Sequence, residues 1–187
     1  MPASADGAPS QELMLVLRAQ EGDGEAFRAL LDSYEPRLLY FLRRFAADEH
    51  LARDLMQEVW LAVFRQLVRL RAPAAFRGWL YQIAHDRAVS RLRRVRREAE
   101  VLECLHSERE VETVDEFIHT EQVEAVHTAL GKLNDDQRVV LTLRFLEDLS
   151  IAEIADVLRL PAGTVKSRLH YAKESLRKVL NQEQIDG

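Results

Sequence analysis

The chain has 187 residues, of which 47% are hydrophobic and 30% charged, and its net charge is -5. This length allows one large domain or two small ones. Seven glycines and five prolines are few for this length, which favours an all-helical chain. The sequence shows neither a long apolar run nor a secretory signal, and Cys104 has no second cysteine to pair with. We therefore expect a cytoplasmic protein.

The charge is distributed unevenly along the chain. Between Arg87 and Arg97 there are six arginines and no acid, whereas residues 98–124 carry ten acids and the single base Arg109. The acidic average therefore hides a basic block beside an acidic one, and it does not exclude binding to nucleic acid.

The N-terminal third predicts helices. Residues 1–9 are expected to form a disordered tail, and a short amphipathic helix follows from Ser10 to Glu21. A second helical tract covers residues 25–45, where Pro36 is expected to divide or kink it.

The next helix is predicted to begin after Asp48 as its N-cap and to run to about Leu70. Opposite its apolar stripe, one face carries mixed side chains: Asp54, Glu58, Leu61 and Arg65, with Gln57 beside them. This face is either a solvated surface or a protein-docking face, because a mixed polar stripe suits a wet interface. The pattern alone does not decide between them.

A basic loop, residues 69–73, precedes a helix from about Ala74 to Arg97. Trp79, Tyr81 and the arginine block are predicted to lie outside the core side of this helix. Aromatic rings interleaved with arginines suit single-stranded nucleic acid, because rings stack on bases and cations bind phosphates. The alternatives are core packing for Trp79 and Trp60, and a solvated helix end for the arginines.

Residues 98–120 form an acidic, poorly patterned linker with some transient helix, and residues 121–133 are predicted to be helical. Asn134 is a candidate cap for the next helix, with Gln137 at the capping-box position. That segment is expected to bury a small apolar set: Val139, Val140, Leu143 and either Phe145 or Leu146.

The stretch from Leu149 to Leu180 predicts two short helices around a tight turn. Ser150 and Glu153 have the spacing of a capping box, residues 160–163 form the break, and Thr164 is the expected N-cap of the second helix. Polar and basic side chains fall outside the apolar stripe of that helix: Lys166, Ser167, Arg168, His170, Tyr171 and Lys173. This is the helix-turn-helix pattern, whose second helix enters the DNA major groove. The alternative is an ordinary helical hairpin with a solvated face.

Three motifs occur in one order: DLMQEVWLAVF at 54–64, FRGWLYQIAHDRAVSRLRR at 76–94, and LRFLEDLSIAEIADVLRLPAGTVKSRLHYAKESL at 143–176. On these motifs the chain resembles the extracytoplasmic-function (ECF) group of bacterial RNA polymerase sigma factors. The resemblance implies an all-α fold of two small helical domains. Sigma domain 2 would span residues 10–97 and sigma domain 4 residues 121–182, with the linker 98–120 between them and a tail at 183–187.

The resemblance also implies roles for matching positions. Residues on the mixed face would bind core RNA polymerase: Asp54, Gln57, Glu58 and Arg65. Residues of the basic loop and the following helix would recognise the -10 promoter element and stabilise strand opening: Arg69, Arg71, Trp79, Asp86, Arg87, Arg91, Arg93 and Arg94. Residues of the last helix would read the -35 element: Thr164, Lys166, Ser167, Arg168, His170, Tyr171 and Lys173.

The implied mechanism is binding without catalysis or cofactor, with core RNA polymerase, promoter DNA and an anti-sigma factor as partners. The acidic linker would be a tether threaded through polymerase, or a mimic of a DNA strand on the arginine block; the resemblance favours the tether. Several positions depart from the common pattern. Among them, Arg159 replaces a frequent glycine, Tyr171 a frequent arginine and Asp86 a frequent asparagine.

Two other functions fit parts of the pattern. A stand-alone helix-turn-helix regulator would bind duplex DNA without polymerase, and a helical interaction protein would bind no DNA. An enzyme is not expected, because the six histidines are scattered and no HExxH or CxxC pair is present to hold a metal.

Overall fold

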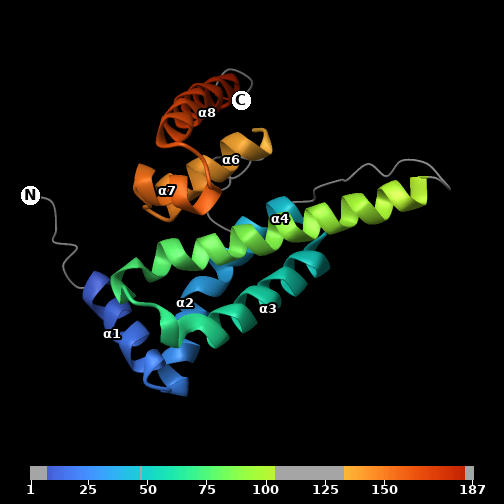
Figure 1. Cartoon of the computed structure of the whole chain (residues 1–187). Helices are drawn as coiled ribbons and strands as arrows, with labels where there is room; N and C mark the ends of the chain where they lie inside the picture. Colours follow the sequence, from blue (N-terminus) through green and yellow to red (C-terminus); the bar gives the residue numbers. More distant parts are fainter. Residues whose placement is uncertain (1–7, 47, 104–132, 184–187) are drawn as a thin grey trace, which may run out of the picture. The chain divides into compact units, whose positions relative to one another are not determined.

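The computed structural model describes residues 8–46, 48–103 and 133–183, and these contain helices and turns but no strand. The chain divides into two compact units, residues 1–110 and 111–187 (Figure 1). The predicted all-α fold of two small helical domains is confirmed. The predicted helix at 121–133 and most of the linker lie outside the described residues.

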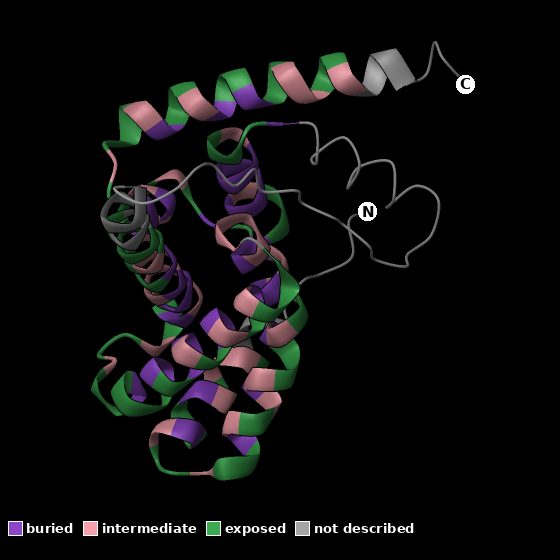
Figure 2. Ribbon diagram, turned by 90° about the vertical axis from the view of Figure 1, so that its right-hand side faces the viewer, coloured by how far each residue is buried: buried purple, intermediate pink, exposed green. Residues whose placement is uncertain are grey.

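The first unit is a helical bundle in which α3 and α4 lie side by side (Figure 1). Its elements are α1 Ala8–Gln20, α2 Gly24–Leu42, η1 Arg43–Phe45, α3 Glu49–Gln66, η2 Leu67–Arg69, η3 Pro73–Ala75 and α4 Phe76–Glu103. The last helix continues six residues beyond the predicted end at Arg97. Buried residues lie on the sides of the helices that face one another (Figure 2).

Aromatic side chains fill the centre of this unit. Tyr34 meets Phe76 edge to face at 5.6 Å between ring centroids, and Phe41 meets Tyr81 at 5.2 Å. All four rings are fully buried. The prediction that Tyr81 lies outside the core was therefore wrong, because its ring fills the space beside Phe41 on α2.

Pro36 does not divide α2, which runs unbroken from Gly24 to Leu42. The proline is exposed. Its missing N–H therefore lies on the outer side of the helix, where water can hydrogen-bond to the carbonyl that is freed.

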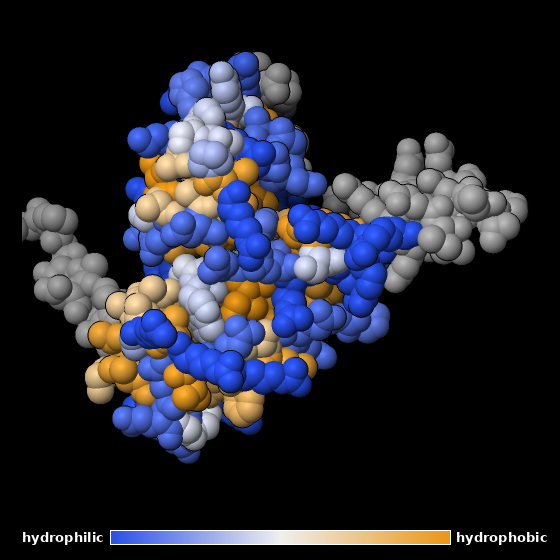
Figure 3. All heavy atoms as spheres, viewed as in Figure 1, coloured by the Kyte–Doolittle hydropathy of each residue, from blue (hydrophilic) through white to orange (hydrophobic). Residues whose placement is uncertain are grey.

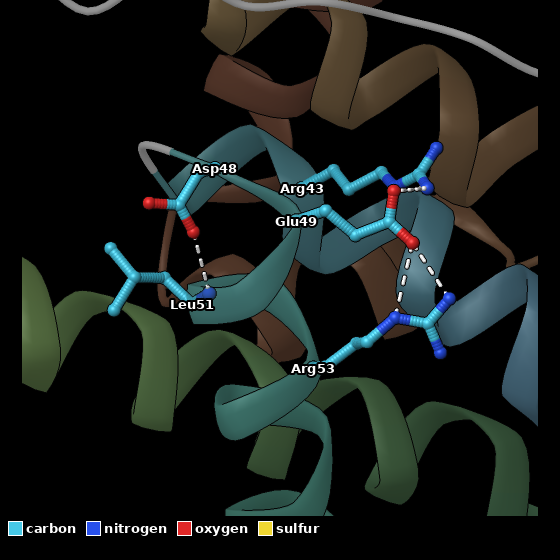
Figure 4. Close-up of polar contacts among 5 residues, drawn as sticks. All are labelled: Arg43, Asp48, Glu49, Leu51 and Arg53. Carbon is cyan, nitrogen blue, oxygen red and sulfur yellow. Dashed lines mark hydrogen bonds and ion pairs between the residues drawn. The ribbon is translucent and has the colours of Figure 1, made fainter.

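Side-chain caps fix the starts of α2 and α3. Asp23 accepts hydrogen bonds from the backbone N–H groups of Glu25 and Ala26, and the bond from Ala26 is the main reason why the pKa of Asp23 is lowered. Asp48 accepts from the N–H of Leu51 at 2.8 Å (Figure 4), as the sequence predicted.

A small ion-pair network lies beside the Asp48 cap. Glu49 pairs with Arg53 at 2.6 Å and with Arg43 at 2.8 Å (Figure 4). The hydrogen bond from Arg53, followed by the charge of Arg43, lowers the pKa of Glu49. Because Arg43 belongs to η1, this network ties the turn before α3 to its first residues.

The second unit consists of α6 Asp135–Leu141, η4 Thr142–Leu146, α7 Ile151–Leu158 and α8 Ala162–Glu183. The Asn134 side chain accepts from the N–H of Gln137 and confirms the predicted cap. The side chain of Gln137 donates instead to Ser175 on α8 at 3.1 Å. This bond holds the start of α6 against α8.

Phe145 and Leu146 are 57% and 40% exposed, so the prediction that one of them is buried was wrong. The backbone makes a wide turn here, in which the N–H of Glu147 bonds to the carbonyl of Thr142, five residues back. Phe145 and Leu146 lie within this wide turn, which moves their side chains away from the face set by regular helical spacing.

The Asp48 cap gives a direct test of the fold. Replacing Asp48 with alanine leaves the N–H of Leu51 without its partner and should lower the free energy of unfolding by about 1 kcal/mol. Asp48→Asn keeps an acceptor oxygen and should lower the free energy of unfolding by only a few tenths of that amount. Urea denaturation followed by circular dichroism measures both. Equal losses in the two variants would show that the cap hydrogen bond is not the source of the stability.

Candidate nucleic-acid interface and docking face

The helix-turn-helix of the second unit begins with the predicted capping box. The N–H of Ser150 donates to the Glu153 carboxylate at 2.7 Å, and the N–H of Glu153 donates to the Ser150 hydroxyl at 3.2 Å. The helix α7 ends at Arg159, which adopts the left-handed conformation with φ 54° and ψ 45°. The N–H of Leu160 then bonds to the carbonyl of Ala155 and closes the turn.

The helix α8 begins at Ala162, two residues before the predicted cap. Thr164 is therefore not an N-cap; that prediction was wrong. The carbonyl of Pro161 accepts from the N–H groups of Thr164 and Val165 at 2.9 and 3.1 Å, so the helical pattern is already established there. Proline suits a helix start, since its missing N–H is not needed in the first turn.

One side of α8 is fixed by Val165, Leu169 and Ala172, which are buried where α8 packs on α6 and α7. The predicted recognition residues lie away from that side. All but two of them are exposed: Lys166, Ser167, His170, Tyr171 and Lys173, with Thr164 and Arg168 partly exposed.

Several of these side chains are held by neighbours. Arg168 pairs with Asp136 of α6 at 3.0 Å, and the Ser167 hydroxyl donates to the carbonyl of Thr164. Lys173 lies over the exposed Phe145 ring at 5.1 Å from its centroid. The pairing of Arg168 keeps its guanidinium beside α6 until a stronger anion competes for it.

The α3 face carries the predicted docking residues and more. Gln57 and Arg65 are exposed, and Asp54 and Glu58 are partly exposed. Leu61 and Phe64 of α3 and Val68 of the adjoining η2 are 55%, 66% and 70% exposed. Sequence reasoning included Leu61 but missed the other two, although their spacing from it by three and seven residues is a helical signal. A polar stripe beside exposed apolar side chains suits a protein partner.

The predicted -10 residues lie on η2, the following loop and α4. Arg69, Arg71, Arg87, Arg93 and Arg94 are exposed, whereas Trp79, Asp86 and Arg91 are partly exposed. Hydrophilic side chains gather along the part of α4 that bears the arginines (Figure 3).

The two tryptophans have different environments. Trp60 is buried and packs edge to face on Phe27, so core packing accounts for it. Trp79 is partly exposed and touches Phe76 at a tilted angle. Of the two, Trp79 is therefore the one that offers ring surface to a ligand.

An ion pair links the two candidate surfaces of the first unit. Glu58 of α3 lies 3.7 Å from Arg91 of α4. The candidate docking face on α3 and the arginines of α4 therefore lie on two helices that pack against each other.

Within the part of the chain that the structure describes, every helix is too short or too polar to span a lipid bilayer. The fold therefore defines a helical protein of two compact units, the second of which contains the helix-turn-helix found in many DNA-binding proteins.

Comparison with known proteins identifies the family. Residues 30–98 match Sigma-70 region 2, and residues 123–176 match Sigma-70, region 4. The RNA polymerase sigma-H factor of Pseudomonas aeruginosa is 36% identical, over 91% of this chain and 94% of the relative. The ECF RNA polymerase sigma-E factor of Escherichia coli is 31% identical, over 87% and 91%. The sigma factor RpoE of Bartonella quintana, solved with the anti-sigma factor NepR, shares the fold with a TM-score of 0.65 at 22% identity, covering 83% of this chain and 96% of that one.

The chain belongs to the sigma-70 family of RNA polymerase sigma factors, in its ECF group. It is therefore a transcription initiation factor that acts with core RNA polymerase on promoter DNA, and the stand-alone regulator is not favoured.

Arg159 provides a test of the helix-turn-helix geometry. Replacing this left-handed residue with glycine should raise the free energy of unfolding by about 1 kcal/mol, because glycine has no Cβ to clash. Arg177→Gly, at an exposed position inside α8, should lower the free energy of unfolding by about 1 kcal/mol. Urea denaturation of both variants measures the two signs. A loss of stability in Arg159→Gly would contradict the strain argument.

Proposed function

We propose that this sigma factor places polymerase on promoters through two separate DNA contacts. The helix α8 binds the -35 element as a duplex, and the first unit captures the -10 element as its strands separate. The observation that carries this proposal is the exposed polar and basic side of α8, opposite a stripe buried within a helix-turn-helix.

The α8 contact divides into positioning and reading. Lys166, Arg168 and Lys173 supply positive charge for phosphates, which fixes the position of the helix on the duplex. Ser167, His170 and Tyr171 are exposed polar side chains suited to base edges in the major groove. Tyr171 offers a ring as well as a hydroxyl.

The first unit contributes to strand opening. Flipping a base out of its stack costs a few kcal/mol, and about 1–3 kcal/mol per base returns through stacking on an aromatic side chain. Trp79 has the partly exposed ring that such stacking needs, and Arg87, Arg91, Arg93 and Arg94 of α4 supply positive charge for the backbone phosphates of the opened strand. Asp86 can accept a hydrogen bond from a cytosine amino group.

The α3 face, with Asp54, Gln57, Glu58 and Arg65, is the proposed site for core polymerase. The exposed Leu61 and Phe64 of α3, with Val68 of the adjoining η2, provide apolar area that the polar groups alone lack. Polymerase performs the chemistry, the sigma factor works in the cytoplasm, and residues 98–120 tether its two domains. An anti-sigma partner is also proposed, since the Bartonella quintana relative was solved in complex with one.

Transcription in vitro tests the function as a whole. Core polymerase is combined with the full chain on a library of genomic fragments, and transcripts are compared with those of core alone. New, discrete start sites are the expected result. Absence of any activated promoter, together with absence of core binding, would refute the proposal.

Reversing charge on the docking face should weaken core binding. The variant Asp54→Lys/Glu58→Lys places two cations where the partner meets two acids, and we expect the dissociation constant for core to rise at least tenfold. Because the cation introduced at position 58 would lie beside Arg91, the single variant Asp54→Lys separates the docking effect from repulsion within the unit. The control Glu21→Lys/Asp32→Lys has the same charge change at positions elsewhere on the first unit. Unchanged core affinity in the Asp54 variants, measured by fluorescence competition, would remove this assignment.

Neutralising α8 should weaken -35 binding and its dependence on salt. Lys166→Ala/Arg168→Ala removes two phosphate-binding cations, so initiation should fall and the slope of log activity against log salt should become shallower by about 1–2. Arg177→Ala/Lys178→Ala removes the same charge from a later, exposed part of α8. Full activity of the first variant at every salt concentration, or equal effects of the two, would count against recognition by the start of α8.

A further inference from the structure

Side chains of α1 hold both ends of the connection between η2 and α4, residues 70–75. At the first end, the amide nitrogen of Gln20 donates hydrogen bonds to the carbonyls of Leu67 and Leu70, at 2.9 and 2.8 Å. Leu70 also donates its N–H to the carbonyl of Leu67 at 3.0 Å. The amide group therefore spans a closed turn with both of its N–H donors.

At the other end, α1 is bonded to the start of α4. The carboxylate of Glu12 accepts from Arg77 at 3.0 Å and from the hydroxyl of Tyr34 at 2.5 Å, and Arg77 also donates to that hydroxyl at 3.3 Å. Burial, with the neighbouring Glu12 carboxylate, raises the pKa of Tyr34. Although burial opposes it, hydrogen bonds to Tyr34 and Glu12 raise the pKa of Arg77. Tyr34 and Arg77 therefore remain protonated donors to Glu12 across the neutral pH range.

The separation of these two anchors is set by α1 itself. Glu12 and Gln20 are eight residues apart on a continuous helix, which is about 12 Å along its axis. The connection between the anchors includes Arg71 and begins just after Arg69, two of the residues assigned to the -10 element. A rigid helix bonded to both ends limits the conformations that this short connection can adopt.

We infer that α1 acts as a brace: it holds residues 70–75, the proposed -10 recognition loop, in one conformation. Gln20 is then a positioning residue for this loop. Gln20 does not touch DNA in this role; it fixes the backbone from which Arg69, Arg71 and the start of α4 meet the element. This inference rests on the proposed -10 function of the loop. A loop fixed before binding loses less conformational freedom when the element is captured, so affinity and base selectivity both gain.

The test uses full-length Gln20→Ala in complex with core polymerase, on a promoter found with the wild-type protein. Selectivity is the ratio of initiation on that promoter to initiation on the same promoter with one altered -10 base. We expect this ratio to fall about tenfold, the size expected for the loss of two neutral hydrogen bonds. Core affinity should stay close to the wild-type value, since the polar docking residues Asp54, Gln57, Glu58 and Arg65 all lie on α3, outside the segment that Gln20 holds. Hydrogen exchange in residues 67–76 should become faster.

Three comparison variants make the result specific. Gln11→Ala changes an exposed glutamine on the same helix and should have no effect. Gln20→Glu keeps the size of the side chain but replaces the donor with a carboxylate, so it should lose at least as much selectivity as Gln20→Ala. Asp48→Ala lowers stability away from the loop, and its selectivity should remain intact.

The inference is overturned if Gln20→Ala keeps wild-type selectivity, or if Asp48→Ala loses selectivity to the same degree. The failure of the underlying function looks different. If Arg71→Ala and Trp79→Ala also leave -10 selectivity unchanged, the first unit does not read this element. The proposed role of α1 as a brace is then refuted together with the -10 assignment. Loss of selectivity in Arg71→Ala, with none in Gln20→Ala, overturns the brace alone.

Discussion

The packing of α4 on α2 through buried aromatic rings is the constraint on which the first unit depends. Phe76 and Tyr81, at the start of α4, are held by Tyr34 and Phe41 of α2. Leu80, Ala84 and Ala88 continue the same buried side. Because this side is fixed, helical geometry turns the arginines outward. The apolar contacts between α4 and α2 thus determine which side of α4 carries the arginines.

The second unit uses the same principle with less buried area. Val165, Leu169 and Ala172 fix α8, and the exposed side follows from the helical period. Arg168 and Arg91 each have an acidic neighbour, Asp136 and Glu58. Solvent-accessible pairs of this kind are worth about 0–1 kcal/mol, so a phosphate can displace either acid at little cost. On the proposed function, stable DNA binding by this acidic chain therefore requires several such contacts together. When both DNA contacts belong to one chain on one polymerase, the first contact raises the effective concentration for the second. Two modest affinities then combine into stronger binding.

The sequence predicted features that depend on residues a few positions apart. The caps at Asp48, Asn134 and Ser150 and the outward side of α8 are of this kind, since each follows from local spacing. It failed where a neighbour distant in sequence, or a local change of winding, decided the outcome. Tyr81 is buried because of Phe41, and Phe145 and Leu146 are exposed because they lie within a wide turn. The bonds of Gln20 to Leu67 and Leu70 span 47 and 50 residues, so no local pattern predicts them.

The arrangement of α3 and α4 has a consequence for how DNA and polymerase are aligned. The proposed polymerase face lies on α3 and the proposed strand-binding row on α4, and these helices pack directly on each other. The pair between Glu58 and Arg91 bridges the two surfaces. The distance and angle between the proposed polymerase face and the proposed strand-binding residues are therefore set by the packing of α3 on α4 within one unit. The linker does not have to carry this alignment, so its acidic and poorly patterned composition is compatible with accurate placement at the -10 element.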